Sequence, residues 1–470
     1  MSPTVAFSLL FGFSLIWLAL GWWLGRANHS MDDYMLAGRK VGLALATATA
    51  MATWVTSNTT MAAPQLAYQL GVWGMIGYAL GAVGLLLFAP MAARIKVLLP
   101  QGFTSGDFIR LRYGVWAWRV FLVISLVYAF GWLISLGMAG GVVVHALSGL
   151  DYQIGMTVIL AVCVGYTLMG GLRAVIATDF IQCLIIIVGV LALAWFVIDH
   201  VGFQTIHTSL AQERPALLDL LFPAAIMFLF NNLLFGVGEI FHSNVWWSRA
   251  FAFDKGVGAK AYMTAGLMWL PIPIVAGFIA LAAPALGVNV PEADMVGPLV
   301  AGKLLGHAGA VVVFVVVFAA LASSLDSLLA ATSDLITEDI YKGHINPNAS
   351  EQQVQRASKL SILGLGVFAW VLCLPKISTL ASLLYFMGAF VASAIWPIVL
   401  GIYYGRANGA TAGLAMVAGT AAGLWAYFAI GFYVAALVSC AVSLLAMLLG
   451  SVIKNARFNF KSLAQSHEAS

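Results

Sequence analysis

Apolar residues fill most of this chain in long blocks that short polar stretches separate. Many of these blocks reach about 18 residues or more, which is the length that an α-helix needs to cross about 30 Å of hydrocarbon. The pattern therefore predicts thirteen membrane-spanning helices. Their approximate centres are residues 15, 55, 83, 132, 162, 187, 233, 272, 321, 364, 391, 419 and 441.

Composition indicates a polytopic membrane protein and argues against a set of soluble domains. Hydrophobic residues make up 62% of the 470 residues and charged residues 9%, whereas soluble domains have about 45–50% and 25%. The net charge is +4, but the basic residues are spread between the apolar blocks, so we expect no nucleic-acid partner. The four cysteines lie inside apolar blocks without C-x-x-C spacing, which argues against disulfides and a zinc site.

The distribution of Lys and Arg predicts how the chain is oriented in the cell membrane. If the N-terminus is outside, the inner loops collect 19 of the 22 Lys and Arg residues, as the positive-inside rule expects. This count places Arg249 in a cytoplasmic loop. We therefore expect an external N-terminus, a first span that is retained rather than cleaved as a signal peptide, and a short cytoplasmic tail over residues 454–470.

Two of the spans carry polar and helix-breaking residues at bilayer depth. Unwound backbone survives at that depth only where it is buried in protein or lines a cavity, and paired interrupted helices mark the binding site of many transporters. The second and seventh spans are five apart, which predicts two five-helix repeats over residues 41–200 and 219–405, with spans 1, 12 and 13 peripheral. The residues concerned are Thr53, Thr56, Ser57, Asn58, Thr59, Thr60, Pro64 and Gln65 in the second span and Pro223, Asn231, Asn232, Gly236, Gly238, Glu239 and His242 in the seventh.

The ninth span places two adjacent serines near mid-bilayer and a carboxylate, Asp326, just after them. Ala320, Ser323, Ser324 and Ser327 recur at i, i+3, i+4 and i+7, so they share one helical face. Hard cations such as sodium prefer oxygen ligands, and carbonyls freed by an unwound helix would complete such a shell. A serine in a membrane helix also commonly bonds back to the i−4 carbonyl or packs against a neighbour without any ion, so both interpretations stay open.

Two further acids lie within spans, where a carboxylate is costly and indicates function by default. Asp179 follows Thr178 shortly after a Gly-Gly pair, so it either caps the start of the sixth span or belongs to a site. Glu239 either faces a water-filled vestibule or pairs with Arg249.

Two regions of the sequence resemble the sodium:solute symporters, a family with a LeuT-type inverted-repeat fold. The first combines GLDY, which begins at Gly149, with the stretch from Tyr166 to Gln182. The second combines ASSLDS, which begins at Ala322, with TEDIYK, which begins at Thr337. The resemblance implies an all-α polytopic transporter, one transmembrane domain over residues 1–470, with sodium and a small solute as its partners. We find no nucleophile–base motif, phosphate loop or paired-histidine spacing, so we do not expect an enzyme.

The resemblance also implies which residues hold cations. A second site, for a cation or a proton, would use Asp179, Asp326 and Ser327, with Asp326 where relatives usually have a hydroxyl residue. The principal sodium (Na+) site would use the backbone carbonyls of Ala52, Val55 and Ala320 and the hydroxyls of Ser323 and Ser324.

The solute of such a fold would sit between the second and seventh spans, with aromatic residues from the fourth. The stretches 77–82, 108–114 and 244–250 are most similar to eukaryotic urea transporters, so we expect urea or a urea-like solute. Sodium-coupled symport of proline or another amino acid is the alternative, because 337–342 is close to the proline transporters' pattern. A membrane sensor domain is an alternative of another class. The solute-binding candidates are Asn58, Thr59, Gln65, Tyr128, Trp132, Asn231, Asn232 and Glu239.

Overall fold

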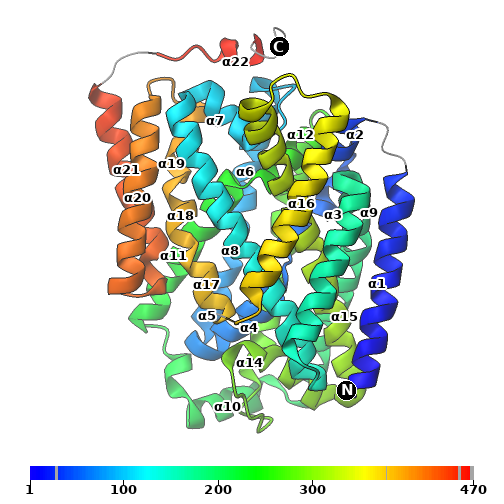
Figure 1. The fold of residues 1–470 in the computed structure, drawn as a ribbon. Coiled ribbons are helices and arrows are strands. Elements are labelled where there is room, and N and C mark those ends of the chain that lie inside the picture. Colours follow the sequence, from blue (N-terminus) through cyan, green and yellow to red (C-terminus); the bar gives the residue numbers. More distant parts are fainter. Residues whose placement is uncertain (27–29, 377, 454–456, 466–470) are drawn as a thin grey trace.

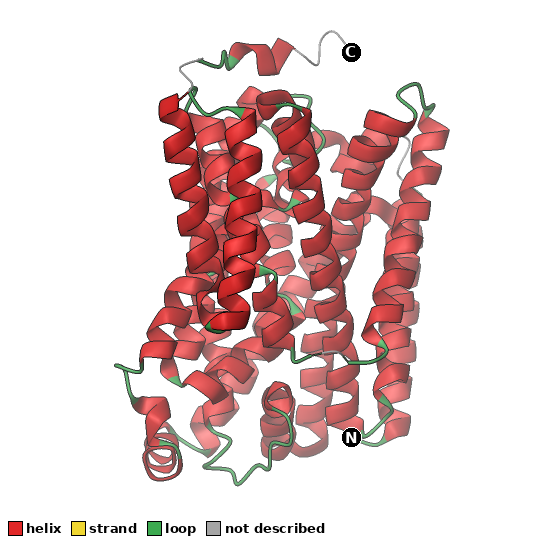
Figure 2. Ribbon diagram, turned by 60° about the vertical axis from the view of Figure 1, so that its left-hand side comes forward, coloured by secondary structure: helices red, strands yellow, loops and turns green. Residues whose placement is uncertain are grey.

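The structure is a computed structural model that describes residues 1–26, 30–376, 378–453 and 457–465. The described residues form a bundle of helices joined by short loops at its two ends, and they contain no β-strand (Figure 2). The predicted tail over residues 454–470 falls partly outside the described residues. The all-α polytopic fold predicted from the sequence is confirmed.

The first half of the chain builds its helices around several interruptions at glycine and polar residues. The helices are α1 (Pro3–Gly25), α2 (Met31–Leu36), η1 (Ala37–Arg39), α3 (Leu43–Trp54), α4 (Ser57–Leu70), α5 (Val72–Ala79), α6 (Ala82–Leu98), α7 (Ser105–Tyr113), α8 (Val115–Ser148), α9 (Tyr152–His200), α10 (Phe203–Glu213) and η2 (Pro215–Leu218).

The second half continues in the same way, and a π-helix, η4, extends its longest helix. The helices are α11 (Pro223–His242), α12 (Asn244–Ala252), α13 (Gly258–Trp269), α14 (Pro271–Leu281), η3 (Ala293–Met295), α15 (Val296–Asp334), η4 (Leu335–Ile345), α16 (Glu351–Cys373), α17 (Leu380–Phe386), α18 (Gly388–Ser393), α19 (Ile395–Tyr403), α20 (Gly409–Ala429), η5 (Phe432–Val434), α21 (Ala435–Ile453) and α22 (Lys461–Gln465).

The described residues contain 11 helices long and apolar enough to cross a membrane. One of them, α9, has 49 residues and would measure about 73 Å if it were straight. It folds back at Gly171, whose φ of 58° favours glycine. Gly171 packs against Tyr34 of α2 at one end of the bundle, while α9 ends beside α10 at the other (Figure 1). Counting α9 twice, and α3 with α4 as one interrupted span, gives the thirteen spans expected.

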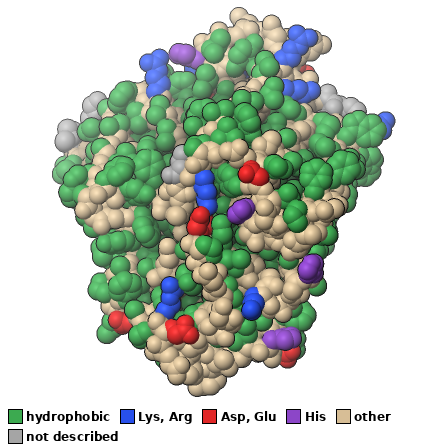
Figure 3. All heavy atoms as spheres, turned by 60° about the horizontal axis from the view of Figure 1, so that its bottom comes forward, with side chains coloured by type: hydrophobic (Ala, Val, Ile, Leu, Met, Phe, Trp, Pro, Cys, Tyr) green, Lys and Arg blue, Asp and Glu red, His purple; other side chains and the backbone are tan. Residues whose placement is uncertain are grey.

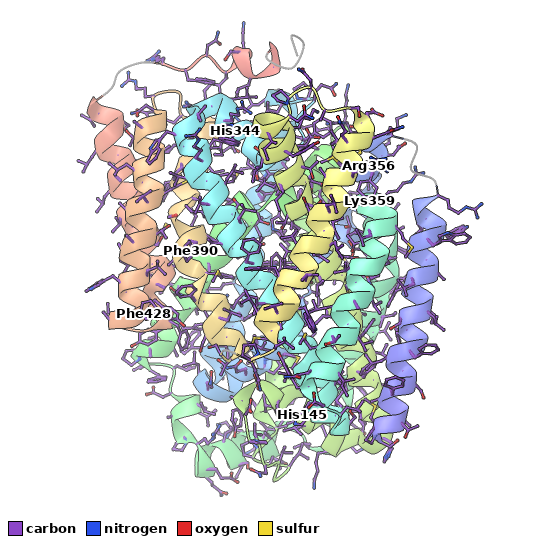
Figure 4. The ribbon with its side chains drawn as sticks, in the orientation of Figure 1. His145, His344, Arg356, Lys359, Phe390 and Phe428 are labelled. Atoms are coloured by element: carbon purple, nitrogen blue, oxygen red, sulfur yellow. The ribbon has the colours of Figure 1, made fainter. Side chains whose placement is uncertain are left out.

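The two ends of the bundle differ in what they carry. The start of α1 and the helix α22 lie at opposite ends (Figure 1), as an odd number of crossings requires. His344, Arg356 and Lys359 lie at the end that carries α22, and His145 lies at the other (Figure 4). The end that carries α10 presents scattered charged and histidine side chains among hydrophobic ones (Figure 3).

Glycines allow α6 and α11 to cross in close contact. A Cβ atom on Gly84 would stand 2.6 Å from the carbonyl oxygen of Gly236, and one on Gly236 would stand 2.7 Å from the Cα of Gly81. Contacts this short involve backbone on both sides, so no rotamer change relieves them. The crossing matters for the site because α11 carries Asn232 and Glu239.

The glycine crossing gives a prediction about stability. We expect Gly84→Val to lower the free energy of unfolding by about 1–3 kcal/mol, the usual effect of overpacking, and to lower the midpoint of thermal denaturation in detergent. Gly364→Val is the control, because a Cβ on Gly364 meets nothing within 4 Å. Equal losses in the two variants would contradict the close packing.

Candidate functional site

The break in the second span lies between α3 and α4, and a reciprocal cap shapes it. The amide of Thr56 donates to Thr59 Oγ1 at 3.2 Å, and the amide of Thr59 donates to Thr56 Oγ1 at 3.1 Å. In a continuous helix these two amides would bond to the carbonyls four residues earlier, which belong to Ala52 and Val55. The cap therefore releases both carbonyls from helical hydrogen bonding in the buried interior.

The serine face of α15 packs against this break. The hydroxyl of Ser324 donates to the carbonyl of Ala320 at 3.0 Å and to that of Thr53 at 3.2 Å. The hydroxyl of Ser323 donates to Asp179 Oδ1, and its oxygen keeps lone pairs that can still coordinate a cation. Both serines are fully buried, so the back-bonding and ion-binding interpretations coexist in one geometry.

A buried ion pair lies beside the serine face. Arg249 on α12 is fully buried, and its Nη2 lies 3.3 Å from Asp179 Oδ2 in the second half of α9. The placement of Arg249 in a cytoplasmic loop is therefore wrong, because the charge count assigns every basic residue between two apolar blocks to water. Asp179 does not cap its helix, since its partners are side chains of α3, α12 and α15.

Asp326 makes its contact on a different side of α15. Its Oδ2 accepts a hydrogen bond from the hydroxyl of Tyr166 at 2.9 Å, and its Oδ1 has no partner among the described residues. Ser327 lies with the ion pair, because its Oγ accepts from Arg249 Nη2 at 2.6 Å. The structure thus separates the carboxylates proposed for the second site into two settings.

A small cavity of about 20 Å³ lies next to the break, and half of its twelve lining residues are aromatic. Trp54 lies edge-on to Trp132, at 6.4 Å between ring centroids, and 5.7 Å from Trp269. Two buried donors of the lining have no partner among the described residues, Trp54 Nε1 and Asn58 Nδ2. The lining residues are Trp54, Thr56, Asn58, Tyr78, Gly81, Tyr128, Trp132, Asn232, Phe235, Gly236, Trp269 and Leu384.

Four of the eight solute-binding candidates, Asn58, Tyr128, Trp132 and Asn232, line this cavity. The amide of Asn232 is already engaged, since it donates to the carbonyl of Gly77 at 2.6 Å and accepts from Tyr385 at 2.6 Å. Its place in the wall is therefore that of a structural residue.

The other four candidates do not line the cavity. Asn231 points away, where it donates to the carbonyl of Phe432 and accepts from the amide of Ala436. Glu239 accepts from Trp246 Nε1 at 3.1 Å and does not pair with Arg249. Thr59 serves in the cap of α4, and Gln65 is buried further along that helix.

Comparison with known proteins identifies the family of this chain. The family model described as the sodium:solute symporter family matches residues 34–419, which is most of the chain. This chain belongs to the sodium:solute symporter family. The family is one of symporters, and the 11 helices of the described residues that are long and apolar enough to cross a membrane fit a multi-pass protein of this family.

Two curated transporters and one solved symporter structure are also similar to this chain. The urea-proton symporter DUR3 of Oryza sativa subsp. japonica is 30% identical over 89% of this chain and 63% of its own length, so the chain spans less than two thirds of that relative. The osmoregulated proline transporter OpuE of Bacillus subtilis is 28% identical over 86% of this chain and 85% of its own length. A solved Na+-coupled sialic acid symporter superposes with a TM-score of 0.80 at 21% identity over 97% of this chain and 99% of its own, which shows a shared LeuT-type fold.

Several residues of the site were missed by the sequence interpretation. Trp54, Tyr78 and Trp269 line the cavity, and Thr49 contacts both members of the ion pair. Trp54 lies within the polar second span, and this position is the one sequence feature that could have marked it as a site residue. The rule that a buried acid needs a partner could have led from Asp179 to Arg249. Trp269 carries no such signal, since an aromatic residue in an apolar span is ordinary.

Proposed function

We propose that this protein is a sodium-coupled secondary active symporter that takes up a small polar organic solute by alternating access, and that the solute is urea or urea-like. The observation that carries the proposal is the release of the Ala52 and Val55 carbonyls by the cap of α4, opposite the serine face of α15. Two serine hydroxyls and three carbonyls form an all-oxygen set of the kind that suits a hard cation.

A negatively charged residue beside the proposed sodium site also favours a cation. Asp179 holds Ser323 by a hydrogen bond, and outer carboxylates of this kind orient ligands and strengthen metal binding. The hydroxyl of Ser323 would keep donating to Asp179 while its oxygen faces the ion. Sodium is therefore the co-transported ion and not a resident cofactor.

Coupling to sodium makes uphill uptake feasible. One charge moving through 100 mV supplies about 2.3 kcal/mol, and a tenfold sodium gradient supplies about 1.4 kcal/mol more. Together they support accumulation of the solute by a few hundredfold. A channel would only equilibrate the solute, so concentration against a gradient separates the two classes.

The cavity favours urea among small solutes. Its volume of about 20 Å³ holds one or two water-sized molecules at about 10–15 Å³ each, so a solute of few atoms needs the least rearrangement. A planar urea would stack on the indole rings, and its carbonyl oxygen would accept from Trp54 Nε1 and Asn58 Nδ2, which otherwise lack partners. Pairing those buried donors would recover the cost of leaving them unsatisfied.

Proline is the second candidate, since a proline transporter is among the relatives. Its carboxylate would need a positive partner, and none of the cavity-lining residues is basic. A membrane sensor domain would transport no solute. Uptake of labelled solute would therefore exclude the sensor alternative.

We extend the proposal to the topology. The end of the bundle with Arg356 and Lys359 (Figure 4) would be cytoplasmic under the positive-inside rule, with the N-terminus outside. The two inverted repeats would span residues 41–200 and 219–405, so that α3 with α4 and α11 with α12 correspond.

The direct test is uptake of labelled urea into proteoliposomes under an inward sodium gradient, with potassium replacing sodium as the control. We expect accumulation above the external concentration that disappears without sodium. Sodium-dependent stabilisation of the protein without urea uptake would retain the symporter and transfer the test to labelled proline. Absence of any sodium response would contradict the proposed function.

The donors of the cavity give a sharper prediction. We expect Asn58→Ala and Trp54→Phe each to raise the KM for urea about three- to tenfold, the effect of losing one buried hydrogen bond of about 0.5–1.5 kcal/mol, with unchanged sodium dependence. Asn289→Ala and Trp425→Phe are matched controls, because both residues are exposed. An unchanged KM in Trp54→Phe would remove the indole from the solute site.

A further inference from the structure

The second cation site is where this chain departs from a simple two-ion arrangement. Its expected ligands were Asp179, Asp326 and Ser327, but the structure brings only Asp179 and Ser327 together, and a guanidinium lies between them. Asp326 turns to Tyr166 instead. The positive charge of Arg249 therefore lies at the place where a second cation would bind.

The guanidinium takes up the oxygens that a second ion would need. Arg249 Nη2 donates to Ser327 Oγ at 2.6 Å, to Thr53 Oγ1 at 2.7 Å and to Asp179 Oδ2 at 3.3 Å. Its Nε donates to Thr49 Oγ1 at 3.0 Å. Asp179 Oδ2 also accepts from Thr49 at 2.6 Å, so an ion at that oxygen would have to displace at least two existing hydrogen bonds.

Arg249 is held in place by its own helix. Its Nη1 donates to the carbonyl of Val245, one turn earlier on α12, at 3.1 Å, and no part of the side chain reaches solvent. An arginine side chain is a cation in proteins. A sodium ion placed beside it would meet a like charge in a poorly screened interior.

The remaining members of the site are consistent with one mobile ion. The other oxygen of Asp179, Oδ1, accepts from Ser323, which faces the principal sodium site. Asp179 thereby connects the fixed charge of Arg249 to the ligand of the mobile ion and needs no second ion for neutrality.

We propose that the guanidinium of Arg249 is a built-in cation that replaces a second sodium ion at Asp179 and Ser327, so that this chain couples transport to a single sodium ion. The inference rests on the proposed sodium symport and specifies its stoichiometry. Arg249 acts through Asp179 and is a positioning residue, since it touches neither the solute cavity nor the principal ligands.

The test is equilibrium binding of radiolabelled sodium to the purified, full-length protein, with choline keeping the ionic strength constant. We expect one sodium ion per chain and a Hill coefficient of 1 for the wild-type protein. Two ions per chain would overturn the inference while keeping the proposed symport. No saturable binding would overturn both, so the two failures are distinguishable.

Two variants strengthen the test. Arg249→Gln removes the charge and leaves Asp179 to attract a cation, so we expect its stoichiometry to rise to two ions per chain, whereas Arg249→Lys keeps one. A folded Arg249→Gln protein that still binds one ion contradicts the replacement. If Arg249→Gln does not fold, Ser327→Ala provides the test. Because Ser327 binds no ion under the proposal, Ser327→Ala should change the half-saturating sodium concentration by no more than about twofold. A larger rise in that concentration would overturn the inference.

Discussion

Replacing Asp179 by alanine is expected to lower the free energy of unfolding by about 3–5 kcal/mol, the cost of leaving one member of a buried ion pair without its partner. Arg249 would keep its bonds to Thr49, Thr53 and Ser327 but would lose the only carboxylate that it contacts among the described residues. Unfolding in mixed micelles of mild detergent and dodecyl sulfate would measure the change.

The control for Asp179→Ala is an exposed ion pair of the same protein. Glu292 contacts Lys376 with 52% of the glutamate side chain exposed, and surface pairs contribute about 0–1 kcal/mol, so Glu292→Ala should change stability little. The double variant Asp179→Leu with Arg249→Met should recover most of the lost stability, because apolar replacements of buried pairs are often neutral. Additive losses in the double variant would contradict the pairing.

Replacing Ser324 by alanine is expected to raise the half-saturating sodium concentration for uptake at least tenfold, by analogy with the 10- to 100-fold losses seen when the surroundings of a metal site are altered. The hydroxyl bonds to the carbonyls of Ala320 and Thr53, so its loss would remove one of the proposed oxygen ligands at the break. Ser323→Ala should act in the same direction and also free Asp179 from its hydrogen bond. Uptake measured against sodium concentration checks both variants.

Ser8→Ala is the matched control for Ser324→Ala. Ser8 also donates to the carbonyl four residues earlier, that of Thr4, at 2.9 Å, but on an exposed face of α1. Its loss should leave the sodium dependence unchanged. If Ser324→Ala behaves like Ser8→Ala, Ser324 is only back-bonded and the proposed sodium site is wrong.

Much of the architecture could be predicted because it follows from local pattern. Helical spans follow from the length of apolar blocks, and polar residues within residues 41–68 indicated an interrupted helix before its position at Val55 and Thr56 was known. The shared face of Ser323 and Ser324 follows from the helical period alone. These features need no knowledge of neighbouring helices.

The placement of Arg249 could not be obtained in this way. Between two apolar blocks, an arginine that faces water and one that is buried look the same in sequence. The difference arises because Asp179, 70 residues earlier, lies at the same depth once α9 folds back at Gly171. Only the packing of α3, α9, α12 and α15 against one another brings the two charges together.

The sequence by itself determined the membrane class, the number of spans, the interrupted second span and the serine face, since each depends on a period or a length within one segment. Tertiary structure decided which polar residues meet. Asn231 and Asn232 are neighbours in α11, yet one bonds to Phe432 and Ala436 while the other bonds to Gly77 and Tyr385 beside the cavity. Successive residues of a helix point about 100° apart, so the rotation of α11 against its neighbours, which no local pattern encodes, selects the residue that lines the cavity.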